Sequence, residues 1–252
     1  MTSEWKLAGH VVLVTGSSRN LGAEIARTMA ARGARVAVNF LSSRRAAQEV
    51  AESLDGSGHA AIGGDVSTPD GVDSVVTETE RLMGASVDIL VNNAGPFTMT
   101  PFADLEPAEF DRIWNANVKA AYLATRRVTP GMAAANWGRV INISAGSAFL
   151  RNHSAYSLAK KAMITLTEQL ALELGPAITV NCVAPGQIAE SAGEIASYDP
   201  GFVQRTLSKT PARRMATRAE VAGVVAVLCS ATFDMVTGVT IAVDGGARLP
   251  AG

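Results

Sequence analysis

The sequence contains few of the residues that build disulfide frameworks and metal sites. Two of its 252 residues are cysteines and three are histidines. Cys182 and Cys229 lie far apart within apolar runs, which favours buried thiols over a disulfide or a metal site. No pair of histidines has the spacing of metal ligands, so we expect no bound metal. Residues 1–6 lack the apolar core of a signal peptide, and we expect a cytoplasmic protein.

Excess charge and long apolar runs are also missing. The chain has 22 basic and 23 acidic residues, so its charge gives no indication of binding to nucleic acid or to an anionic membrane. No uninterrupted apolar run approaches the roughly 18 residues that a membrane span needs. The three tryptophans have no basic groove beside them that would favour base stacking. We therefore expect neither a nucleic-acid partner nor a membrane partner.

Apolar residues are plentiful at 48%, so a chain of this length can bury the core of one large α/β domain. Short β-branched runs alternate with amphipathic stretches. Strands are predicted at residues 10–15, 35–40, 59–64, 87–91, 139–143, 178–183 and 239–243, and helices at 21–31, 44–54, 72–83, 107–127, from about 156, and at 220–230. Pro130 is expected to kink or end the helix that begins at 107, and residues 187–210 show no clear period.

Continuous apolar strands that alternate with helices predict a parallel sheet covered on both faces. No linker, repeat or low-complexity tract interrupts the alternation, so we expect residues 1–252 to form one domain. In a doubly wound sheet of this kind, ligands bind at the carboxyl ends of the strands, near the point where the strand order reverses.

A tyrosine and a lysine four residues apart open one of the predicted helices. Tyr156 and Lys160 would lie on one face of that helix, because positions i and i+4 are neighbours. A free tyrosine has a pKa of about 10, and a nearby ammonium lowers that value by favouring the phenolate. A tyrosine tuned in this way can exchange a proton with an alcohol or a carbonyl group. The spacing alone is weak evidence, since an aromatic ring packed under a solvated lysine has the same pattern.

The first predicted strand runs directly into a glycine-containing turn, Thr15-Gly16-Ser17-Ser18-Arg19-Asn20-Leu21-Gly22. Small residues between a strand and a helix let the backbone approach a pyrophosphate. The helix N-terminus then offers free N–H groups and a partial positive charge. We therefore expect this turn to bind phosphate groups and not merely to connect two elements.

Six short motifs stand in an order that resembles the short-chain dehydrogenase/reductase family. They are the turn at residues 15–22, Asn92-Asn93-Ala94-Gly95, Asn117, Tyr156 with Lys160, Pro185-Gly186 and Asp244-Gly245-Gly246. The pattern is closest to 3-oxoacyl-[acyl-carrier-protein] reductases and similar ketoreductases. The resemblance implies a single-domain Rossmann-like α/β fold, a doubly wound parallel sheet of seven strands with helices on both faces, a nicotinamide cofactor and a homotetramer.

The chain departs from the family pattern at two positions outside the catalytic loop. Asn20 replaces the middle glycine of the first turn, and asparagine tolerates a left-handed backbone better than most residues, so the turn can persist. Glu190 replaces the threonine that often follows Pro-Gly-x-Ile.

The resemblance also assigns roles to individual residues. It implies that Tyr156 donates the proton, that Lys160 lowers its pKa and holds the nicotinamide ribose, and that Asn117 positions a water. Residues 187–210 would form a lid over the substrate. Apolar faces at 220–230 and on the final strand would meet other subunits around two-fold axes. The implied cofactor-binding residues are Gly16, Ser18, Arg19, Asn20, Leu21, Gly22, Asn39, Ser42, Ser43, Asp65, Val66, Asn93, Ala94, Gly95, Tyr156, Lys160, Pro185, Gly186 and Ile188.

The position of the catalytic serine is ambiguous. The family places it three residues after an asparagine that ends the fifth strand and thirteen before the tyrosine, and here those positions hold Ala145 and Ile143. Ser144 and Ser147 both lie close enough in sequence to supply a hydroxyl. We favour Ser144, because it stands at the strand end where the cleft should open, and Ser147 is the alternative.

The second strand favours NADP(H) over NAD(H). An acidic residue at its end would bind the ribose 2′-hydroxyl of NAD and repel a 2′-phosphate, but Asn39 is followed by no acid before Glu49. Arg19, Arg44 and Arg45 instead surround the expected site, and a guanidinium group suits a phosphate dianion. The alternative is that Arg44 and Arg45 are only the solvated start of a helix.

The motifs together favour reduction of a ketone or aldehyde by NADPH. The second class considered is a nucleotide-binding regulatory protein without catalysis, but such relatives usually lack the tyrosine or the lysine, and both are present. Among enzymes, the alternative to a small free substrate is an acyl thioester on a carrier protein. Residues 132–137 carry no charge, and Leu172 stands where an arginine is often found, which lowers the expectation of an acidic carrier.

Overall fold

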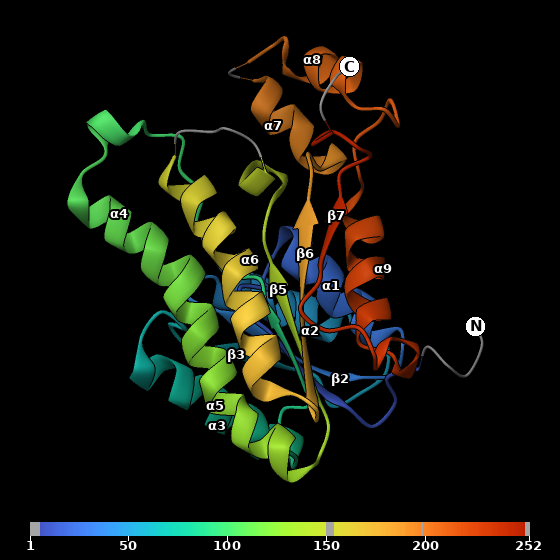
Figure 1. The fold of residues 1–252 in the computed structure, drawn as a ribbon. Helices are drawn as coiled ribbons and strands as arrows, with labels where there is room; N and C mark the ends of the chain where they lie inside the picture. The colour runs from blue at the N-terminus through green and yellow to red at the C-terminus, as the bar shows by residue number, and fades with distance from the viewer. Residues whose placement is uncertain (1–5, 150–153, 198, 250–252) are drawn as a thin grey trace.

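A parallel β-sheet forms the centre of the molecule (Figure 1). Across residues 6–149, 154–197 and 199–249, which the computed structural model describes, seven strands pair in the order β3-β2-β1-β4-β5-β6-β7. The strands are β1 (Val11–Val14), β2 (Arg35–Phe40), β3 (Ala60–Gly63), β4 (Ile89–Asn92), β5 (Gly138–Ile143), β6 (Ile178–Pro185) and β7 (Thr240–Val243). The order reverses between β1 and β4, so the sheet is doubly wound, as the sequence predicts.

Helices cover both faces of this sheet (Figure 1). One face packs against α1 (Asn20–Ala30), α2 (Arg44–Glu52) and α9 (Arg218–Leu228), and the other against α3 (Pro69–Met83), α5 (Ala120–Ala134) and α6 (Ala155–Leu174). Side chains of β1 alternate between the two faces: Val12 and Val14 belong to one apolar cluster, and Val11 and Leu13 to the other. Burial on both faces explains why the strands read as unbroken apolar runs. In the described part of the chain, no helix is both long and apolar enough to cross a membrane.

The helix expected from residue 107 is longer than predicted. It begins as α4 (Pro107–Trp114), passes through a π-helical turn at Asn115–Lys119 and continues as α5 to Ala134. Pro130 lies inside α5, so the expectation that the helix could end there is wrong. A proline removes one backbone donor, but Val128 and Met132 on either side of it are 1% exposed and pack against the sheet. That burial stabilises the last turn more than one missing hydrogen bond weakens it.

Two short helices occupy the region for which the sequence shows no clear period. They are α7 (Ala192–Ala196) and α8 (Phe202–Lys209), and Figure 1 shows them beyond the carboxyl ends of the strands. A helix of five or eight residues makes at most about two turns, too few for an apolar repeat to appear. The sequence therefore could not reveal them.

A chain of buried hydrogen bonds crosses the sheet near its carboxyl edge. Asn92 of β4 donates to Thr125 Oγ1 of α5 at 3.2 Å and to Asn142 Oδ1 of β5 at 2.9 Å. Asn142 in turn donates to Thr167 Oγ1 of α6 at 2.9 Å, and Thr167 donates to the carbonyl of Met163 at 2.7 Å. Buried amides are costly unless they are paired, so the chain of bonds fixes α5 and α6 relative to β4 and β5.

This network predicts different outcomes for two buried threonines. Thr167→Val should lower the free energy of unfolding by about 1–3 kcal/mol, because it leaves the Asn142 amide without an acceptor. Thr179→Val is the matched control: Thr179 is 5% exposed, and its hydroxyl has no partner among the described residues. We expect that variant to unfold like the wild type in urea. Equal losses in the two variants would show that the chain of bonds adds nothing.

Candidate active site

The carboxyl ends of β1 and β4 are joined through one hydroxyl and one amide. Thr15 Oγ1 accepts from the backbone N–H groups of Asn93 and Ala94, both at 3.0 Å. The side chain of Asn93 donates to the carbonyls of Thr15 and Gly16, also at 3.0 Å. The first glycine turn and the Asn-Asn-Ala-Gly segment, which lie 77 residues apart in sequence, therefore form one rigid corner at the switch point of the sheet.

Glycine is required twice where these two segments meet. Gly16 has a φ of 61°, and a Cβ there would stand 2.9 Å from the Cα of Ala94. A Cβ on Gly22 would lie 2.6 Å from the amide nitrogen of Asn93. Asn20 adopts a φ of 52°, so the prediction that asparagine can replace glycine in this turn is confirmed. The backbone thus forms a shallow cradle without side chains in it.

The first turn of α1 leaves its N–H groups open beside that cradle. Arg19 precedes the helix with an extended backbone and makes no side-chain capping bond, and no acidic residue stands in the first turn. Helix N-termini of this kind attract anions. Ser18 and Leu21 are half-buried around the same turn. The residues present therefore fit a pyrophosphate.

Asn39 does not face this cradle as a cofactor ligand would. It is 2% exposed, its Oδ1 accepts from the N–H of Gly16 at 3.2 Å, and its amide donates to the carbonyls of Ile62 and Gly64, both at 3.2 Å. Both the oxygen and the nitrogen of the side-chain amide are hydrogen-bonded beneath the turn. The side chain points there because successive residues of a strand point to opposite faces of the sheet. Asn39 therefore supports the turn from inside the fold, and its expected contact with a cofactor stays a prediction.

Basic residues and an open helix end lie beyond β2. Ser43 precedes α2 without capping it, and no acid stands in the first turn of that helix. Ser42 is exposed, and Arg44 lies over the ring of Phe40 with its guanidinium carbon 5.7 Å from the ring centroid. Arg19 is exposed at the start of α1. These groups surround a surface on which a negative charge would be stabilised.

The other expected cofactor residues line the same edge of the sheet. Asp65 turns its carboxylate back onto Ser67, accepting from the N–H at 2.9 Å and from the hydroxyl at 2.7 Å, and Val66 is buried at 7% exposure. Pro185 ends β6, and a Cβ on Gly186 would stand 2.8 Å from the Cα of Asp244. Only small residues fit at this contact between the sixth and seventh strands.

The predicted catalytic helix begins where the sequence indicates. Ser154 caps α6, and its hydroxyl accepts from the N–H of Ser157 at 3.2 Å. Tyr156 and Lys160 occupy the first two turns, and the lysine Nζ lies 5.5 Å from the centroid of the tyrosine ring. The expectation that the two side chains share one helix face is confirmed.

Two hydrogen bonds join Lys160 of α6 to the end of β5. The ammonium of Lys160 donates to the carbonyl of Ile143 at 2.8 Å. The hydroxyl of Ser144 donates to the carbonyl of Lys160 at 2.6 Å. Lys160 is 4% exposed and Ser144 2% exposed, so both bonds lie out of contact with bulk water. We refer to this pair of bonds as the β5–α6 clasp.

Burial, and not charge pairing, dominates the protonation of the two groups. It raises the pKa of Tyr156 to about 12 and lowers the pKa of Lys160 to about 8. We expected the lysine to depress the pKa of the tyrosine, but in the chain alone the cause that acts on the phenol is loss of water around it, and the pKa rises. Tyr156 therefore holds its proton throughout the physiological range, while Lys160 can gain or lose one near neutrality.

The two candidate serines differ in what their hydroxyls contact. The hydroxyl of Ser144, the residue that the sequence favours, already donates its hydrogen bond to the carbonyl of Lys160 in the β5–α6 clasp. The Oγ of Ser147 is buried and has no hydrogen-bond partner among the described residues. A Cβ on Gly146 would lie 3.3 Å from the Cα of Gly186, so the loop between the two serines packs closely on the end of β6. Of the two serines, Ser147 is therefore the one whose hydroxyl makes no hydrogen bond within the described chain.

Asn117 lies in the π-helical turn between α4 and α5, a distortion that is frequent at functional sites. Its amide donates to the carbonyls of Pro96 at 3.1 Å and Ile113 at 2.9 Å. Its Oδ1 is buried without a partner in the described chain, and a Cβ on Gly95 would stand 2.1 Å from it. Gly95 is therefore glycine because Asn117 reaches beneath it.

The first residues of the region 187–210 are hydrogen-bonded to the segment where α9 begins. Ile188 forms a parallel bridge with Ala216, and the N–H of Ala189 donates to the carbonyl of Ala216 at 2.9 Å. The carboxylate of Glu190 accepts from the N–H of Arg218 at 3.1 and 3.2 Å. The residue that replaces the family's threonine thus caps a helix.

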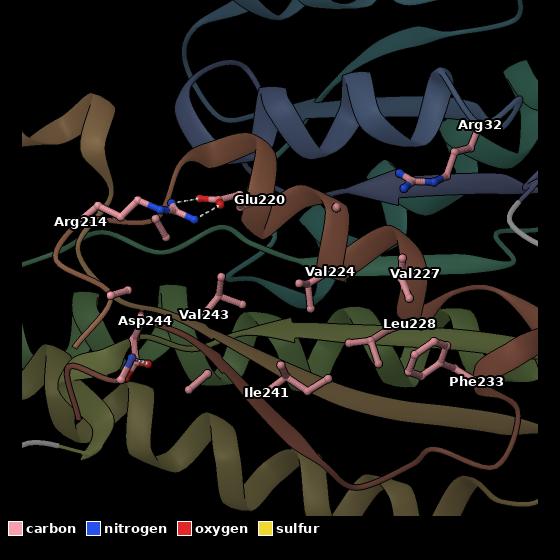
Figure 2. Close-up of a pocket in the computed structure, with 16 residues that line it drawn as sticks. Arg32, Arg214, Glu220, Val224, Val227, Leu228, Phe233, Ile241, Val243 and Asp244 are labelled. Atoms are coloured by element: carbon pink, nitrogen blue, oxygen red, sulfur yellow. Dashed lines mark hydrogen bonds and ion pairs between the residues drawn. The ribbon is translucent and has the colours of Figure 1, made fainter. Parts of the chain in front are cut away.

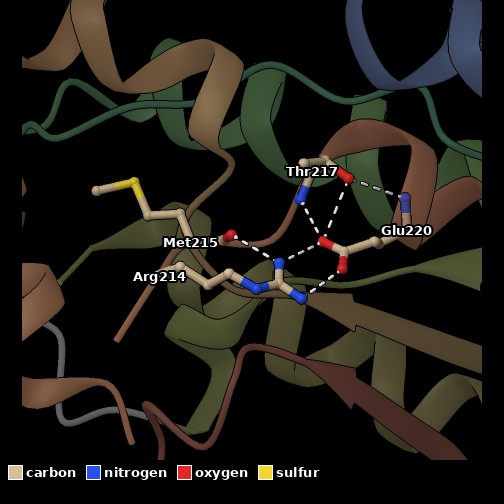
Figure 3. Close-up of polar contacts among 4 residues, drawn as sticks. All are labelled: Arg214, Met215, Thr217 and Glu220. Atoms are coloured by element: carbon tan, nitrogen blue, oxygen red, sulfur yellow. Dashed lines mark hydrogen bonds and ion pairs between the residues drawn. The ribbon is translucent and has the colours of Figure 1, made fainter. Parts of the chain in front are cut away.

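A second anchor holds the chain where it returns from α8 to α9 (Figure 3). Arg214 donates to both carboxylate oxygens of Glu220 at 2.8 and 2.6 Å, and Glu220 also accepts from the N–H of Thr217 at 2.8 Å. These hydrogen bonds, those from Arg214 foremost, hold the pKa of Glu220 near 2. The short helices α7 and α8 lie between these two anchors, so both ends of the segment that carries them are fixed at the carboxyl edge of the sheet.

Sequence reasoning did not single out Phe97. Its ring meets the ring of Tyr156 edge to face, with centroids 5.2 Å apart and an interplanar angle of 84°. The signal available in the sequence is Phe97-Thr98-Met99 directly after the Asn-Asn-Ala-Gly segment, where neither period nor charge marks an element.

The buried ammonium predicts a conflict between stability and function. A pKa lowered from 10.5 to about 8 means that the folded state disfavours the charged lysine by at most about 3 kcal/mol. This penalty is fully present below pH 8 and fades as pH rises towards 10.5. Lys160→Met should therefore raise the free energy of unfolding at pH 7 by about 1–2 kcal/mol, after loss of the bond to Ile143.

Chemical denaturation of the cofactor-free protein between pH 6.5 and 10 measures this effect. The gain should shrink at the alkaline end, and Lys161→Met, which changes the exposed neighbour, should show neither the gain nor its pH dependence. A Lys160→Met variant that is less stable than wild type at pH 7 would contradict the prediction.

Comparison with known proteins extends over nearly the whole chain. The family model described as enoyl-(acyl carrier protein) reductase matches residues 16–248. Versicolorin reductase 1 from Aspergillus parasiticus is 35% identical over 263 residues, which cover 98% of this chain and 99% of that protein. The 3-oxoacyl-[acyl-carrier-protein] reductase FabG from Aquifex aeolicus is 33% identical over 249 residues, which cover 96% of this chain and 99% of that enzyme.

The fold is shared with solved structures as well. A gluconate 5-dehydrogenase from Burkholderia cenocepacia, in complex with NADP and tartrate, superposes with a TM-score of 0.89 at 29% identity and covers 98% of each chain. Sequence and overall fold agree along nearly the whole chain, so the predicted resemblance is confirmed. This chain belongs to the short-chain dehydrogenase/reductase family of oxidoreductases, whose members use a nicotinamide cofactor.

Proposed function

We propose that this protein reduces a ketone or an aldehyde to an alcohol with NADPH, in the cytoplasm, with all 252 residues forming one catalytic domain. The observation that carries the proposal is the pairing of Tyr156 with Lys160 at the same edge of the sheet as the glycine cradle. A regulatory protein without catalysis has no need for a buried lysine beside a half-buried phenol. That arrangement is costly to fold, and proton transfer gives a reason to keep it.

Each residue of the site has a distinct task in the proposed reaction. The reduced nicotinamide, when bound, supplies the hydride. Tyr156 donates its proton to the carbonyl oxygen, which its raised pKa keeps available. Lys160, with a pKa of about 8, holds a proton beside the tyrosine ring, and that proton can restore the phenol. The partnerless Oδ1 of Asn117 suits a bound water that would connect this pocket to solvent.

Ser147 is the better candidate for the hydroxyl that holds the substrate oxygen. Stabilisation of the developing alkoxide needs a donor that is free when the reaction starts. Ser144 is already committed to the carbonyl of Lys160, whereas Ser147 Oγ has no partner in the described chain. We therefore assign Ser144 to the positioning of Lys160 and Ser147 to the substrate.

Carrier-protein substrates are the weaker alternative, although the family model and FabG are both named for them. An acidic carrier would need free basic side chains around the cleft. Leu172 is 81% exposed on α6, and Arg127 is bound to Asp73 at 2.7 Å, which leaves Arg126 as the exposed cation next to it. We favour a free carbonyl compound over an acyl thioester on this ground.

A groove between α9 and β7 supports assembly into a homotetramer. Val224, Val227 and Leu228 of α9 face Ile241 and Val243 of β7 across it (Figure 2). No catalytic residue lines this groove, so it is not the substrate site. An apolar surface of this kind fits the self-complementary contact of a two-fold axis.

Loss of the phenolic hydroxyl should remove the chemistry and leave the fold. Tyr156→Phe is expected to lower kcat for carbonyl reduction by about 10²–10⁴-fold, the range of general acid catalysis. NADPH binding, followed by fluorescence titration, should be unchanged. Full turnover by the Phe variant would refute the assignment.

The serine assignment is tested in the same assay. Ser147→Ala should reduce kcat, whereas Ser144→Ala should chiefly lower thermal stability by opening the β5–α6 clasp. If both variants turn over like the wild type, the reaction proceeds without a serine.

The basic residues beyond β2 predict a preference for NADPH over NADH of about 10- to 100-fold at low salt. This preference should shrink as ionic strength rises, because the site is exposed. Arg19→Ala should weaken NADPH by that factor and leave NADH nearly unchanged. Arg27→Ala, at the far end of α1, is the control. Equal loss of both cofactors on changing Arg19 would contradict the role.

The groove predicts how the assembly can be broken. Val224→Glu should reduce the tetramer to smaller species in sedimentation velocity at micromolar concentration, because it buries a carboxylate at the contact. Leu82→Glu, which changes an exposed apolar residue on the opposite face of the sheet, should leave the tetramer intact. A wild-type protein that sediments only as a monomer would rule out the assembly.

A further inference from the structure

In residues 96–104, which join β4 to α4, apolar side chains are exposed and a polar side chain is buried. Phe97, Met99 and Phe102 are 59%, 66% and 48% exposed, whereas Thr98 between them is 7% exposed. Thr98 Oγ1 donates to the carboxylate of Glu109 at 2.7 Å. Single exposed apolar residues are common, but three within six residues around a buried hydroxyl form a patch that indicates binding.

This segment, which we call the apolar wall, is held in place at three points. The carbonyl of Pro96 accepts from Asn117, the hydroxyl of Thr98 binds Glu109, and Pro101 forms an antiparallel bridge with Ser154. Proline restricts the backbone at both ends of this stretch. The outward direction of the apolar side chains is therefore built into the fold.

The wall stands beside the proton donor. Ser154, to which Pro101 is bridged, lies two residues before Tyr156 and caps its helix. Phe97 meets the Tyr156 ring edge to face at 5.2 Å. A ligand whose carbonyl reaches Tyr156 would therefore lie next to Phe97, and Met99 is exposed two residues further along the segment.

The chemistry of the wall excludes some substrates and favours others. Residues 94–103 contain no charged side chain, and the hydroxyls of Thr98 and Thr100 are bonded to each other at 3.0 Å. A hydroxyl-rich or charged ligand would lose water here without gaining partners. At the same end of the molecule, Phe202, Val203 and Leu207 of α8 are half-exposed (Figure 1).

We infer that the substrate is a bulky apolar ketone whose aromatic or fused-ring body packs against Phe97 and Met99. This inference rests on the proposed carbonyl reduction and specifies its substrate class. Phe97 acts as a specificity residue: its ring offers an aromatic partner the edge or face contact that such rings prefer. Small ketones would react at the same site but gain nothing from the wall.

Kinetics with a matched pair of ketones test the inference. 2-Tetralone carries a fused aromatic ring, cyclohexanone has the reacting ring alone, and 5-ketogluconate is the hydroxyl-rich comparison. The variants are Phe97→Ala, the conservative Phe97→Leu, and Met235→Ala as the control. Met235 is 95% exposed and follows Asp234, which pairs with Arg139 near the start of β5, at the opposite edge of the sheet.

The wild type should show a kcat/KM for 2-tetralone at least 10-fold above that for cyclohexanone. Phe97→Ala should lower kcat/KM for 2-tetralone by about 10- to 100-fold, mainly through KM, and should change cyclohexanone by less than about threefold. Phe97→Leu should recover part of the loss, and Met235→Ala should change nothing. Equal losses for both ketones would show that Phe97 only positions Tyr156 and would overturn the inference.

Preference of the wild type for 5-ketogluconate, or an unchanged ratio in Phe97→Ala, would also overturn it while leaving carbonyl reduction intact. Oxidation of NADPH by none of the three would instead count against the proposed function. In that case the affinity for 2-naphthol, which cannot be reduced, tests the inference without turnover. Phe97→Ala should weaken 2-naphthol binding about 10-fold, and equal affinity in wild type and variant would refute binding at the apolar wall. A variant that changes only the sedimentation coefficient would identify the wall as a contact between copies of the chain.

Discussion

The contact between the ends of β1 and β4 is the constraint from which the whole cleft is built. Thr15 and Asn93 exchange hydrogen bonds across it, and Gly16 comes so close to Ala94 that no side chain fits between them. On one side, this closeness opens the cradle before α1. On the other, it directs the chain through Gly95 over Asn117 and into the apolar wall. The proposed cofactor surface and the proposed substrate surface therefore lie on two sides of one backbone crossing.

The catalytic pair depends on a balance that works against stability. The fold buries Lys160 and partly buries Tyr156, and burial moves their pKa values in opposite directions, to about 12 for the tyrosine and about 8 for the lysine. The β5–α6 clasp makes this burial possible, because it gives the ammonium a carbonyl and ties the helix to the strand. The result is a phenol that stays protonated beside an amine whose pKa is lowered, as the proposed proton transfer needs, and neither would exist on an isolated helix.

Much of this arrangement could be predicted from single residues. Apolar strands alternating with helices were enough to predict the doubly wound sheet, because burial on both faces makes most positions of a strand apolar. The glycine turn, the Tyr156–Lys160 spacing and the tolerance of Asn20 for a left-handed backbone follow from local geometry. The contacts of Asn39, Ser144 and Phe97 could not be predicted, because each depends on atoms contributed by another segment of the chain.

The sequence by itself determined the seven strands, the long helices between them, their order and the family, since these depend on periodicity and on short motifs within one segment. The tertiary structure alone decided where side chains point and which groups lose water. It turned Asn39 inward because strand residues alternate, engaged Ser144 with Lys160 because β5 and α6 meet there, and carried the helix past Pro130 because its neighbours are buried. It also raised the pKa of Tyr156, because desolvation depends on everything packed around the phenol and a neighbouring charge is only one part of it.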